Sequence, residues 1–212
     1  MKTKKVLFFL FSFLAVGVGF YPLVFLASNT QFPILNGKSQ ELLGDVIWNI
    51  SFYSHISLGG VALLIGWSQF SKKLRNKYLQ LHRLIGKIYV GSVLLSAIGG
   101  IYIGFFAAGG IISKVGFISL GIIWFYTTLK AFLEVKKGRI EQHKKMMIYS
   151  YAACFAAVTL RLLLPLLIVF FHEFVPAYQV VAWLCWVPNL LVAHFIILKK
   201  SKDKIPLNSS IL

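Results

Sequence analysis

Six long apolar runs constrain this chain more than any other feature of its sequence. A helix needs about 20 residues to cross a hydrocarbon core of about 30 Å, and each run reaches that length. Only short polar stretches separate the runs. The pattern therefore predicts an all-α, polytopic transmembrane bundle of six spans, which forms a single domain over residues 1–212 and ends in a short cytoplasmic tail at 199–212. The predicted spans are Val6–Ala27, Val46–Phe70, Ile85–Ala107, Lys114–Val135, Met147–Phe171 and Val175–Leu198.

The composition excludes several other classes of protein. Hydrophobic residues make up 58% of the chain and charged residues 13%, whereas soluble domains have about 45–50% and about 25%. So few polar groups cannot cover the surface of a water-soluble globule. A soluble enzyme, a disordered tail and a disulfide-stapled secreted domain are therefore excluded.

The first apolar run allows two interpretations. Lys2, Lys4 and Lys5 precede it, as in a secretory signal peptide. Its apolar part is longer than the 7 to 15 residues typical of a signal peptide. A retained first helix is therefore the favoured interpretation, and cleavage would leave five spans.

The net charge of +16 could indicate nucleic-acid binding, but the placement of the basic residues favours another explanation. Of the 22 Lys and Arg residues, 17 fall in the N-terminal segment, the second and fourth connections and the C-terminal tail, and Lys87 and Lys130 near the adjoining span ends bring the total on this side to 19. These segments share one side of the membrane if six spans are present. The positive-inside rule then places both termini in the cytoplasm, in the cell inner membrane. Anionic inner-leaflet lipids, and not nucleic acid, are the expected partners of these segments.

Ionisable side chains inside spans are the best pointers to function, because lipid penalises them unless they are paired or face a cavity. The sequence shows no serine nucleophile, phosphate loop or metal cluster, so it does not decide whether the protein is an enzyme. The candidates are His55 in the second span, Arg161 in the fifth, His82 and His143 at the starts of the third and fifth, and His194 in the sixth.

Small residues share a helix face with two of these histidines. His55 is followed at helical spacing by Gly59 and Gly66, and His82 by Gly86 and Tyr89. Close helix packing is the ordinary interpretation of such stripes. The alternative is a flat ligand such as haem, which would lie against the small residues.

Depth in the membrane pairs the candidates. His82 and His143 both lie where a basic connection enters a span, so they are expected at the same inner level. We interpret them as possible axial ligands of one haem b iron, with Arg83 and Lys144 available for the propionates. The competing interpretation is that both histidines anchor their helices at the interface.

The second pair lies nearer the outer side. His55 is about 12 Å and Arg161 about 15 Å from the outer ends of their spans, at 1.5 Å per residue. With Gly59 and Tyr89 they form a predicted pocket for a quinone carbonyl or a carboxylate. In the alternative, Arg161 snorkels or binds helix carbonyls only.

Several motifs together resemble a known family. They are His55-x3-Gly59-Gly60 to Gly66-x2-Gln69-Phe70, then Arg75, His82-Arg83-x2-Gly86-x2-Tyr89, and His143-Lys144-x-Met146-Met147 with Tyr151 and Arg161. Over about Trp48 to Arg161 the chain resembles the bacterial membrane proteins called domain of unknown function 2306. Met146 and Tyr149 stand where that family is expected to have an aromatic residue and an arginine. The resemblance implies the membrane class and no particular activity.

The chain is more distantly similar to cytochrome b561 and ferric reductase bundles, in which histidines of the central four helices hold two haems. That resemblance implies one ligand pair here, His82 and His143, since the other would need a histidine in the fourth span. Together these features predict a haem b electron-transfer protein with a quinone-like or carboxylate pocket. The alternative is a non-redox membrane protein that binds a small molecule or lipid, or serves as an accessory subunit, with structural histidines.

Overall fold

The computed structural model describes residues 2–23, 35 and 37–202, and its main elements are all helices. Six of the described helical segments are long and apolar enough to cross a membrane. They confirm the predicted all-α class and number of spans. Residues 24–27 of the predicted first span and 203–212 of the predicted tail lie outside the described residues. The spans are Val6–Leu23, Val46–Phe70, Leu79–Gly104, Gly110–Lys136, Ile140–Phe171 and Phe174–Ser201.

Four helices form a closed ring. Helix α4 (Val46–Gly66) packs along α6 (Leu79–Gly104), α6 along α7 (Gly110–Lys136), α7 along α8 (Ile140–Cys154), and α8 returns to α4. Consequently α6 and α8 face each other across the ring. Short helices connect the ring: α3 (Gln40–Gly44), η2 (Trp67–Phe70) and α5 (Lys72–Lys77).

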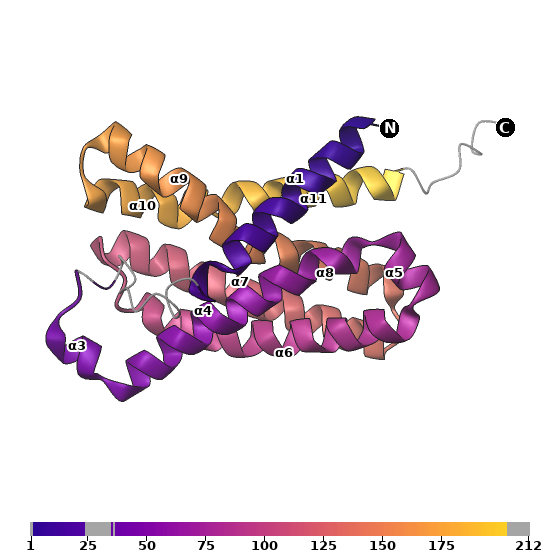
Figure 1. The fold of residues 1–212 in the computed structure, drawn as a ribbon, viewed down its shortest axis with the longest axis horizontal. Coiled ribbons are helices and arrows are strands. Elements are labelled where there is room, and N and C mark those ends of the chain that lie inside the picture. The colour runs from indigo at the N-terminus through magenta and orange to yellow at the C-terminus, as the bar shows by residue number, and fades with distance from the viewer. Residues whose placement is uncertain (1, 24–34, 36, 203–212) are drawn as a thin grey trace, which may run out of the picture.

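The other helices form a second layer beside the ring (Figure 1). Helix α1 packs on α4 and α9, α10 packs on α7 and α9, and α11 packs on α8 and α10. Figure 1 shows α9, α10, α11 and α1 together on one side of α4, α6, α7 and α8. The bounds are Lys2–Gly19 for α1, Ala156–Phe171 for α9, Phe174–Leu184 for α10 and Val187–Lys202 for α11.

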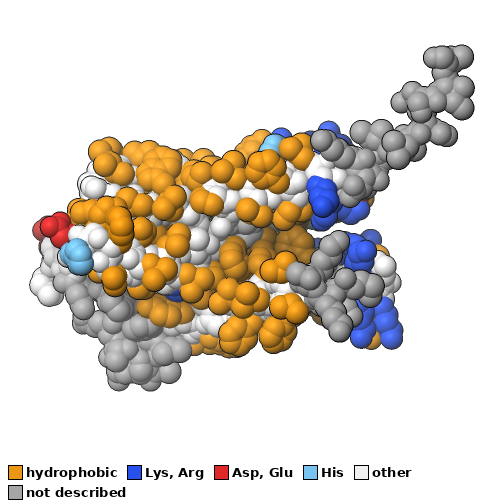
Figure 2. Space-filling view, turned by 90° about the horizontal axis from the view of Figure 1, so that it is seen from above, with side chains coloured by type: hydrophobic (Ala, Val, Ile, Leu, Met, Phe, Trp, Pro, Cys, Tyr) orange, Lys and Arg blue, Asp and Glu red, His pale blue; other side chains and the backbone are white. Residues whose placement is uncertain are grey.

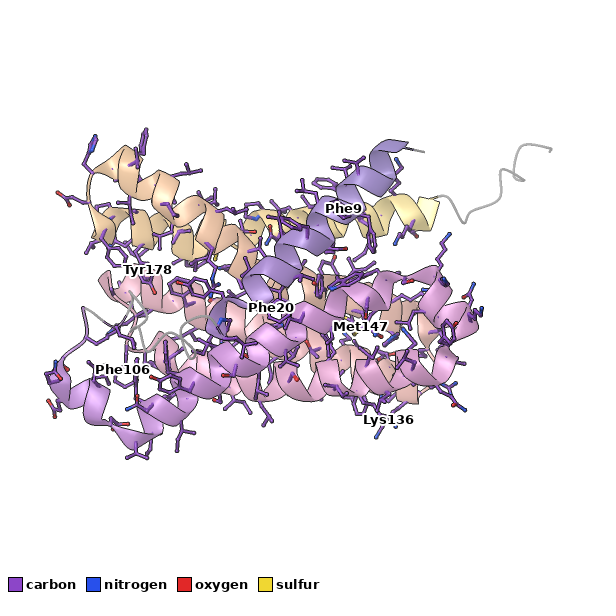
Figure 3. All side chains as sticks on the ribbon, viewed as in Figure 1. Phe9, Phe20, Phe106, Lys136, Met147 and Tyr178 are labelled. Atoms are coloured by element: carbon purple, nitrogen blue, oxygen red, sulfur yellow. The ribbon has the colours of Figure 1, made fainter. Side chains whose placement is uncertain are left out.

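Basic side chains gather at one end of the molecule, and hydrophobic side chains cover its middle (Figure 2). We call this the basic end; it holds α5, the α7–α8 connection and the end of α11. Figure 3 shows Lys136 at this end and Phe106 at the opposite end, which we call the far end. The apolar belt between the two ends matches the surface that a bilayer would cover.

The fifth and sixth spans are both interrupted. Helix α8 ends at Cys154 and α9 begins at Ala156, and two turn residues separate α10 from α11. Asn189 joins the two interruptions: its Nδ2 donates to the Cys185 carbonyl at 2.9 Å and to Thr159 Oγ1 at 3.0 Å. Each segment still counts as one candidate membrane span, as the sequence predicts, but the apolar pattern does not show that the helix within it is divided. Interrupted helices at membrane depth require backbone groups that are satisfied by protein or that line a cavity.

Glycines bring the ring helices together. A Cβ at Gly66 would lie 2.3 Å from Tyr151 Cε2 and 2.7 Å from Tyr89 Cε2, and one at Gly99 would lie 2.6 Å from the Ser51 carbonyl oxygen. Real Cβ atoms do not approach neighbours so closely. At Gly66 the small residue therefore serves helix packing, the ordinary interpretation of the stripe.

We expect Gly66→Ala to destabilise the protein by about 1–3 kcal/mol, because the added methyl group overlaps two buried rings. Gly91→Ala is the matched control, since a Cβ there meets no heavy atom within 4 Å and alanine is the better helix former by about 1 kcal/mol. Thermal unfolding in detergent measures both. Equal stability of the two variants would contradict this packing role.

Candidate functional site

A cavity of about 980 Å³ lies between the ring and the second layer. Residues of α4, α6, α7, α8, α9 and α10 line it, together with residues near the end of α1 and in the connection between α1 and α3, and most of them are apolar. Its volume is in the range of small-molecule and cofactor sites. The lining residues with polar or sulfur-containing side chains are Tyr21, Lys38, Trp48, His55, Trp124, Cys154, Arg161, Tyr178 and Cys185.

Arg161 on α9 supplies a guanidinium to this cavity. Its Nη1 donates to the Ala157 carbonyl at 2.9 Å, and its Cζ lies 4.4 Å from the ring centroid of Tyr21. Its Nε is enclosed and has no hydrogen-bond partner among the described residues. A guanidinium has five N–H donors, and one of these donates to a described residue.

His55 on α4 lies in the same cavity lining. Its Nδ1 is 2.9 Å from the Ser96 carbonyl oxygen, and Ser96 Oγ donates to the His55 carbonyl at 2.8 Å. Gly100 leaves room for the imidazole, because a Cβ there would lie 2.7 Å from Nδ1. Two contacts to α6 thus fix the orientation of the ring.

Lys38 adds a second cation, which the sequence analysis did not select. Its Nζ donates to the carbonyl of Phe106. Burial lowers the pKa of Lys38, and the neighbouring Lys114 lowers it further. Among the described residues that line the cavity, none is Asp or Glu. The cavity therefore favours a ligand with an anionic or hydrogen-bond-accepting group. An isolated lysine outside the spans carries little signal in the sequence.

The structure brings together three of the four residues of the predicted pocket. His55, Gly59 and Arg161 all line the cavity, whereas Tyr89 is absent from its lining. Tyr89 is fully buried in the ring, where its hydroxyl lies 2.8 Å from Ser150 Oγ.

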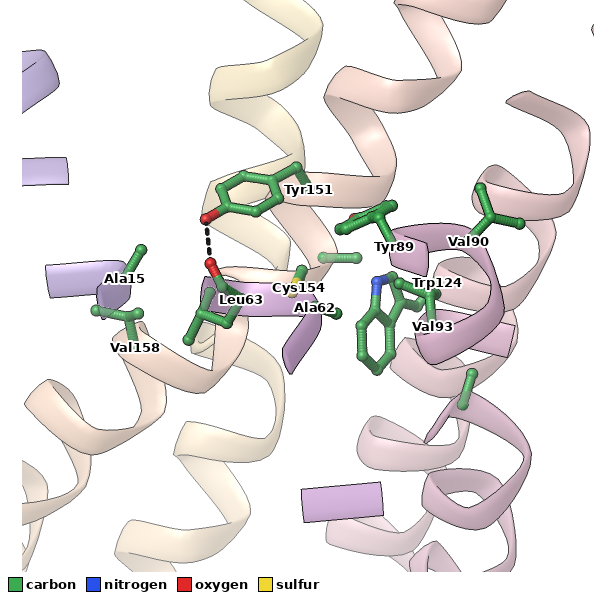
Figure 4. Packing of buried hydrophobic residues seen from close by; sticks show 12 residues of the cluster. Ala15, Ala62, Leu63, Tyr89, Val90, Val93, Trp124, Tyr151, Cys154 and Val158 are labelled. Carbon is green, nitrogen blue, oxygen red and sulfur yellow. Dashed lines mark hydrogen bonds between the residues drawn. The ribbon is translucent and has the colours of Figure 1, made fainter. Parts of the chain in front are cut away.

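Ser150 also lies 2.6 Å from Thr128 Oγ1, so hydroxyl groups of three ring helices meet at the centre. Tyr151 donates to the Leu63 carbonyl beside them (Figure 4). The rings of Tyr89 and Tyr151 have their centroids 6.2 Å apart. This part of the ring is packed core.

The other predicted pair lies near the basic end. His82 and His143 occupy the first turns of α6 and α8, which face each other across the ring. His82 lies seven positions before Tyr89 and His143 seven positions before Ser150, two of the residues whose hydroxyls meet at the centre of the ring. Seven positions correspond to about 10 Å along a helix. Neither histidine lines the cavity.

The two histidines of this pair differ in their hydrogen bonding. His143 Nδ1 donates to the Ala131 carbonyl at 2.9 Å, which leaves Nε2 as a ligand atom, the usual arrangement of metal-bound histidines. His82 Nδ1 is enclosed and has no partner among the described residues. Of the predicted propionate partners, Arg83 is exposed, whereas Lys144 already donates to Glu141 at 2.9 Å. Within the described ranges, no three His, Cys, Asp or Glu side chains form a metal cluster.

The interruptions of the fifth and sixth spans contribute residues that the sequence analysis did not assign to the site. Cys154 and Ala156 flank the first interruption, Cys185 lies in the second, and all three line the cavity. Both cysteines are free thiols. Pro188, the second residue of α11, is a sequence signal of the second interruption, because proline is favoured in the first turn of a helix.

Comparison with known proteins places the chain in a family. No curated protein and no solved structure matches it. The profile of a predicted membrane protein family, DUF2306, matches residues 52–197 and therefore includes His55, His82, His143 and Arg161. Since the match extends over more than half of the sequence and confirms the resemblance of the motifs, this chain belongs to the DUF2306 family of predicted membrane proteins.

Proposed function

We propose that this integral membrane protein binds one amphiphilic small molecule in the cavity between the ring and the second layer. The polar head of the molecule lies at Arg161 and His55, and its apolar part contacts the aliphatic and aromatic lining. A quinone-like carbonyl or a carboxylate has the acceptor oxygens that a guanidinium binds. The observation that carries the proposal is an apolar cavity of about 980 Å³ with a guanidinium in its lining.

The electrostatics of the lining support this assignment. Arg161 and Lys38 are cationic groups, and no described lining residue is acidic. A structural arginine inside a membrane protein is usually paired with an acid or with backbone carbonyls. Arg161 has one carbonyl partner and an enclosed, unpartnered Nε among the described residues. An acceptor from a ligand would complete its hydrogen bonding.

The proposed orientation follows from the basic end. The positive-inside rule places this end in the cytoplasm, with both termini, in the cell inner membrane. The exposed lysines and arginines then contact anionic inner-leaflet lipids. His55 and Arg161 lie farther along their helices from that end than His82 and His143 do, so the cavity faces the outer half of the bilayer.

Filling the cavity tests the proposal. Trp48 and Trp124 line it, so a decyl-substituted benzoquinone bound there is expected to quench tryptophan fluorescence in detergent. Ala157→Phe is expected to weaken this binding more than about tenfold, equivalent to about 1.4 kcal/mol, because the ring occupies the ligand's volume. Leu162→Phe, on a lipid-exposed position of the same helix, is the control. Equal quenching curves for both variants would place the quinone in bulk lipid or detergent.

We further propose haem b, held by His82 and His143, as a second candidate that would make the protein an electron carrier. The placement of the two imidazoles on opposite helices of the ring favours it, together with the hydrogen bond from His143 Nδ1 to Ala131. Axial ligation by two histidines and burial of the macrocycle would set the reduction potential. This candidate does not depend on the ligand cavity.

A further inference from the structure

We propose that the head group of the cavity ligand carries a hydroxyl that donates to His55 Nε2, next to an oxygen that accepts from Arg161. This inference rests on the proposed ligand site and specifies its chemistry. The ligand class is then an alkyl-substituted phenol or hydroquinone, and not a carboxylate.

The hydrogen bonds of His55 fix the position of its ring proton. The Ser96 carbonyl oxygen, 2.9 Å from Nδ1, can only accept. Ser96 Oγ, 3.2 Å from Nδ1, already donates its own proton to the His55 carbonyl at 2.8 Å, so it also accepts from the imidazole. Both neighbours therefore require a proton on Nδ1.

A neutral imidazole with its proton on Nδ1 has a lone pair on Nε2. No described residue donates a hydrogen bond to this nitrogen, because the hydrogen bonds of the His55 ring to described residues all involve Nδ1. The atom is also not among the enclosed polar atoms that lack a partner. Since His55 lines the cavity, Nε2 is an acceptor that a bound molecule can reach.

The cavity thus combines an acceptor on His55 with donors on Arg161. Arg161 Nη1 donates to Ala157, which leaves other N–H groups for a ligand. A head group with both a hydroxyl and an acceptor oxygen matches this combination. A carboxylate has acceptors only, so it leaves His55 Nε2 without a donor, and an unmatched polar group lowers affinity.

Two substitutions at His55 separate the roles of its nitrogens. In His55→Asn the side-chain amide can still donate to Ser96 from a position near Nδ1, but the acceptor at Nε2 is lost. In His55→Gln the amide oxygen can take the place of Nε2, so an acceptor is retained. Decylhydroquinone and its dimethyl ether, which has no hydroxyl, serve as probes under anaerobic reducing conditions, with tryptophan quenching in full-length protein as the readout.

The wild type is expected to bind decylhydroquinone about tenfold more tightly than the dimethyl ether, the ratio typical of one hydrogen bond. His55→Asn should lose this preference, and His55→Gln should retain most of it. A preference that persists in His55→Asn would reflect the size of the methyl groups and overturn the inference, as would tighter wild-type binding of dodecanoate than of decylhydroquinone.

A different result would contradict the proposed function itself. It fails if the Ala157→Phe substitution changes the affinity for none of the three probes, decyl-substituted benzoquinone, decylhydroquinone and dodecanoate. Thermal unfolding of each His55 variant confirms that it is folded. If His55→Asn does not fold, two measurements still decide the inference: the ratio of the wild-type affinities for decylhydroquinone and its dimethyl ether, and the same ratio in His55→Gln. Equal wild-type affinities for the two probes overturn the inference.

Discussion

Replacing Arg161 by glutamine is expected to weaken binding of the decyl-substituted benzoquinone about 10- to 100-fold. The wild-type guanidinium lies in the cavity lining and has donors without described partners. A hydrogen bond to a charged donor contributes about 1.5–3 kcal/mol when its partner is truncated, and every 1.4 kcal/mol corresponds to a factor of ten. Quenching of tryptophan fluorescence gives the dissociation constants.

Arg83→Gln makes the same chemical change at an exposed position outside the cavity, so it should leave binding unchanged. Arg161→Lys keeps the charge but not the planar fork that stacks over Tyr21, and we expect an intermediate affinity. If both Arg161→Gln and Arg83→Gln bind the probe as tightly as the wild type, the Arg161 guanidinium has a structural role. The ligand head group then does not bind at Arg161.

The second large effect concerns haem. Protein from cells supplied with a haem precursor is expected to show a Soret band that shifts on reduction with dithionite, and His143→Ala should abolish it. The reason is that the imidazole supplies an axial nitrogen that alanine cannot replace. His82→Ala is expected to have the same effect, and absorption spectra of the purified variants measure it.

His194→Ala is the control for this experiment. His194 is exposed and its Nδ1 lies 2.8 Å from the Tyr149 hydroxyl, on a helix outside the ring. Its replacement should leave the spectrum unchanged. A folded, colourless wild type would end the haem proposal, and a band that survives both His82→Ala and His143→Ala would move the haem to other ligands.

Hydrophobicity alone was enough to predict the membrane class and the approximate position of each span, because the bilayer sets a minimum length for an apolar helix. The ends were less predictable. Helix α6 begins at Leu79, six residues before the predicted start of the third span, and α8 begins at Ile140. Polar residues in a first turn are compatible with a helix, so the helix can begin before the apolar run does. Hydrophobicity therefore does not mark these helix starts.

Depth along the helices predicts one site for His55 and Arg161, and both residues occur in the lining of one cavity. Helical periodicity placed Tyr89 on the face of His82 but could not show which neighbour that face meets. In the structure it meets Ser150, on the helix across the ring. The interruption at Phe155 has no proline or glycine within several residues on either side, so no local sequence signal marks it.

The paired interruptions have a mechanical consequence. The hairpin of α9 and α10 forms one wall of the cavity. It continues into α8 and α11 through two short turn segments, which Asn189 ties together and in which Phe155 and Cys185 keep right-handed helical backbone angles. Bending at those segments would rotate the α9–α10 hairpin as a unit relative to the ring, without a change in the packing of the ring helices. Such a bend would open the cavity toward the lipid, so a ligand could enter from the side of the bundle without any ring helix unwinding.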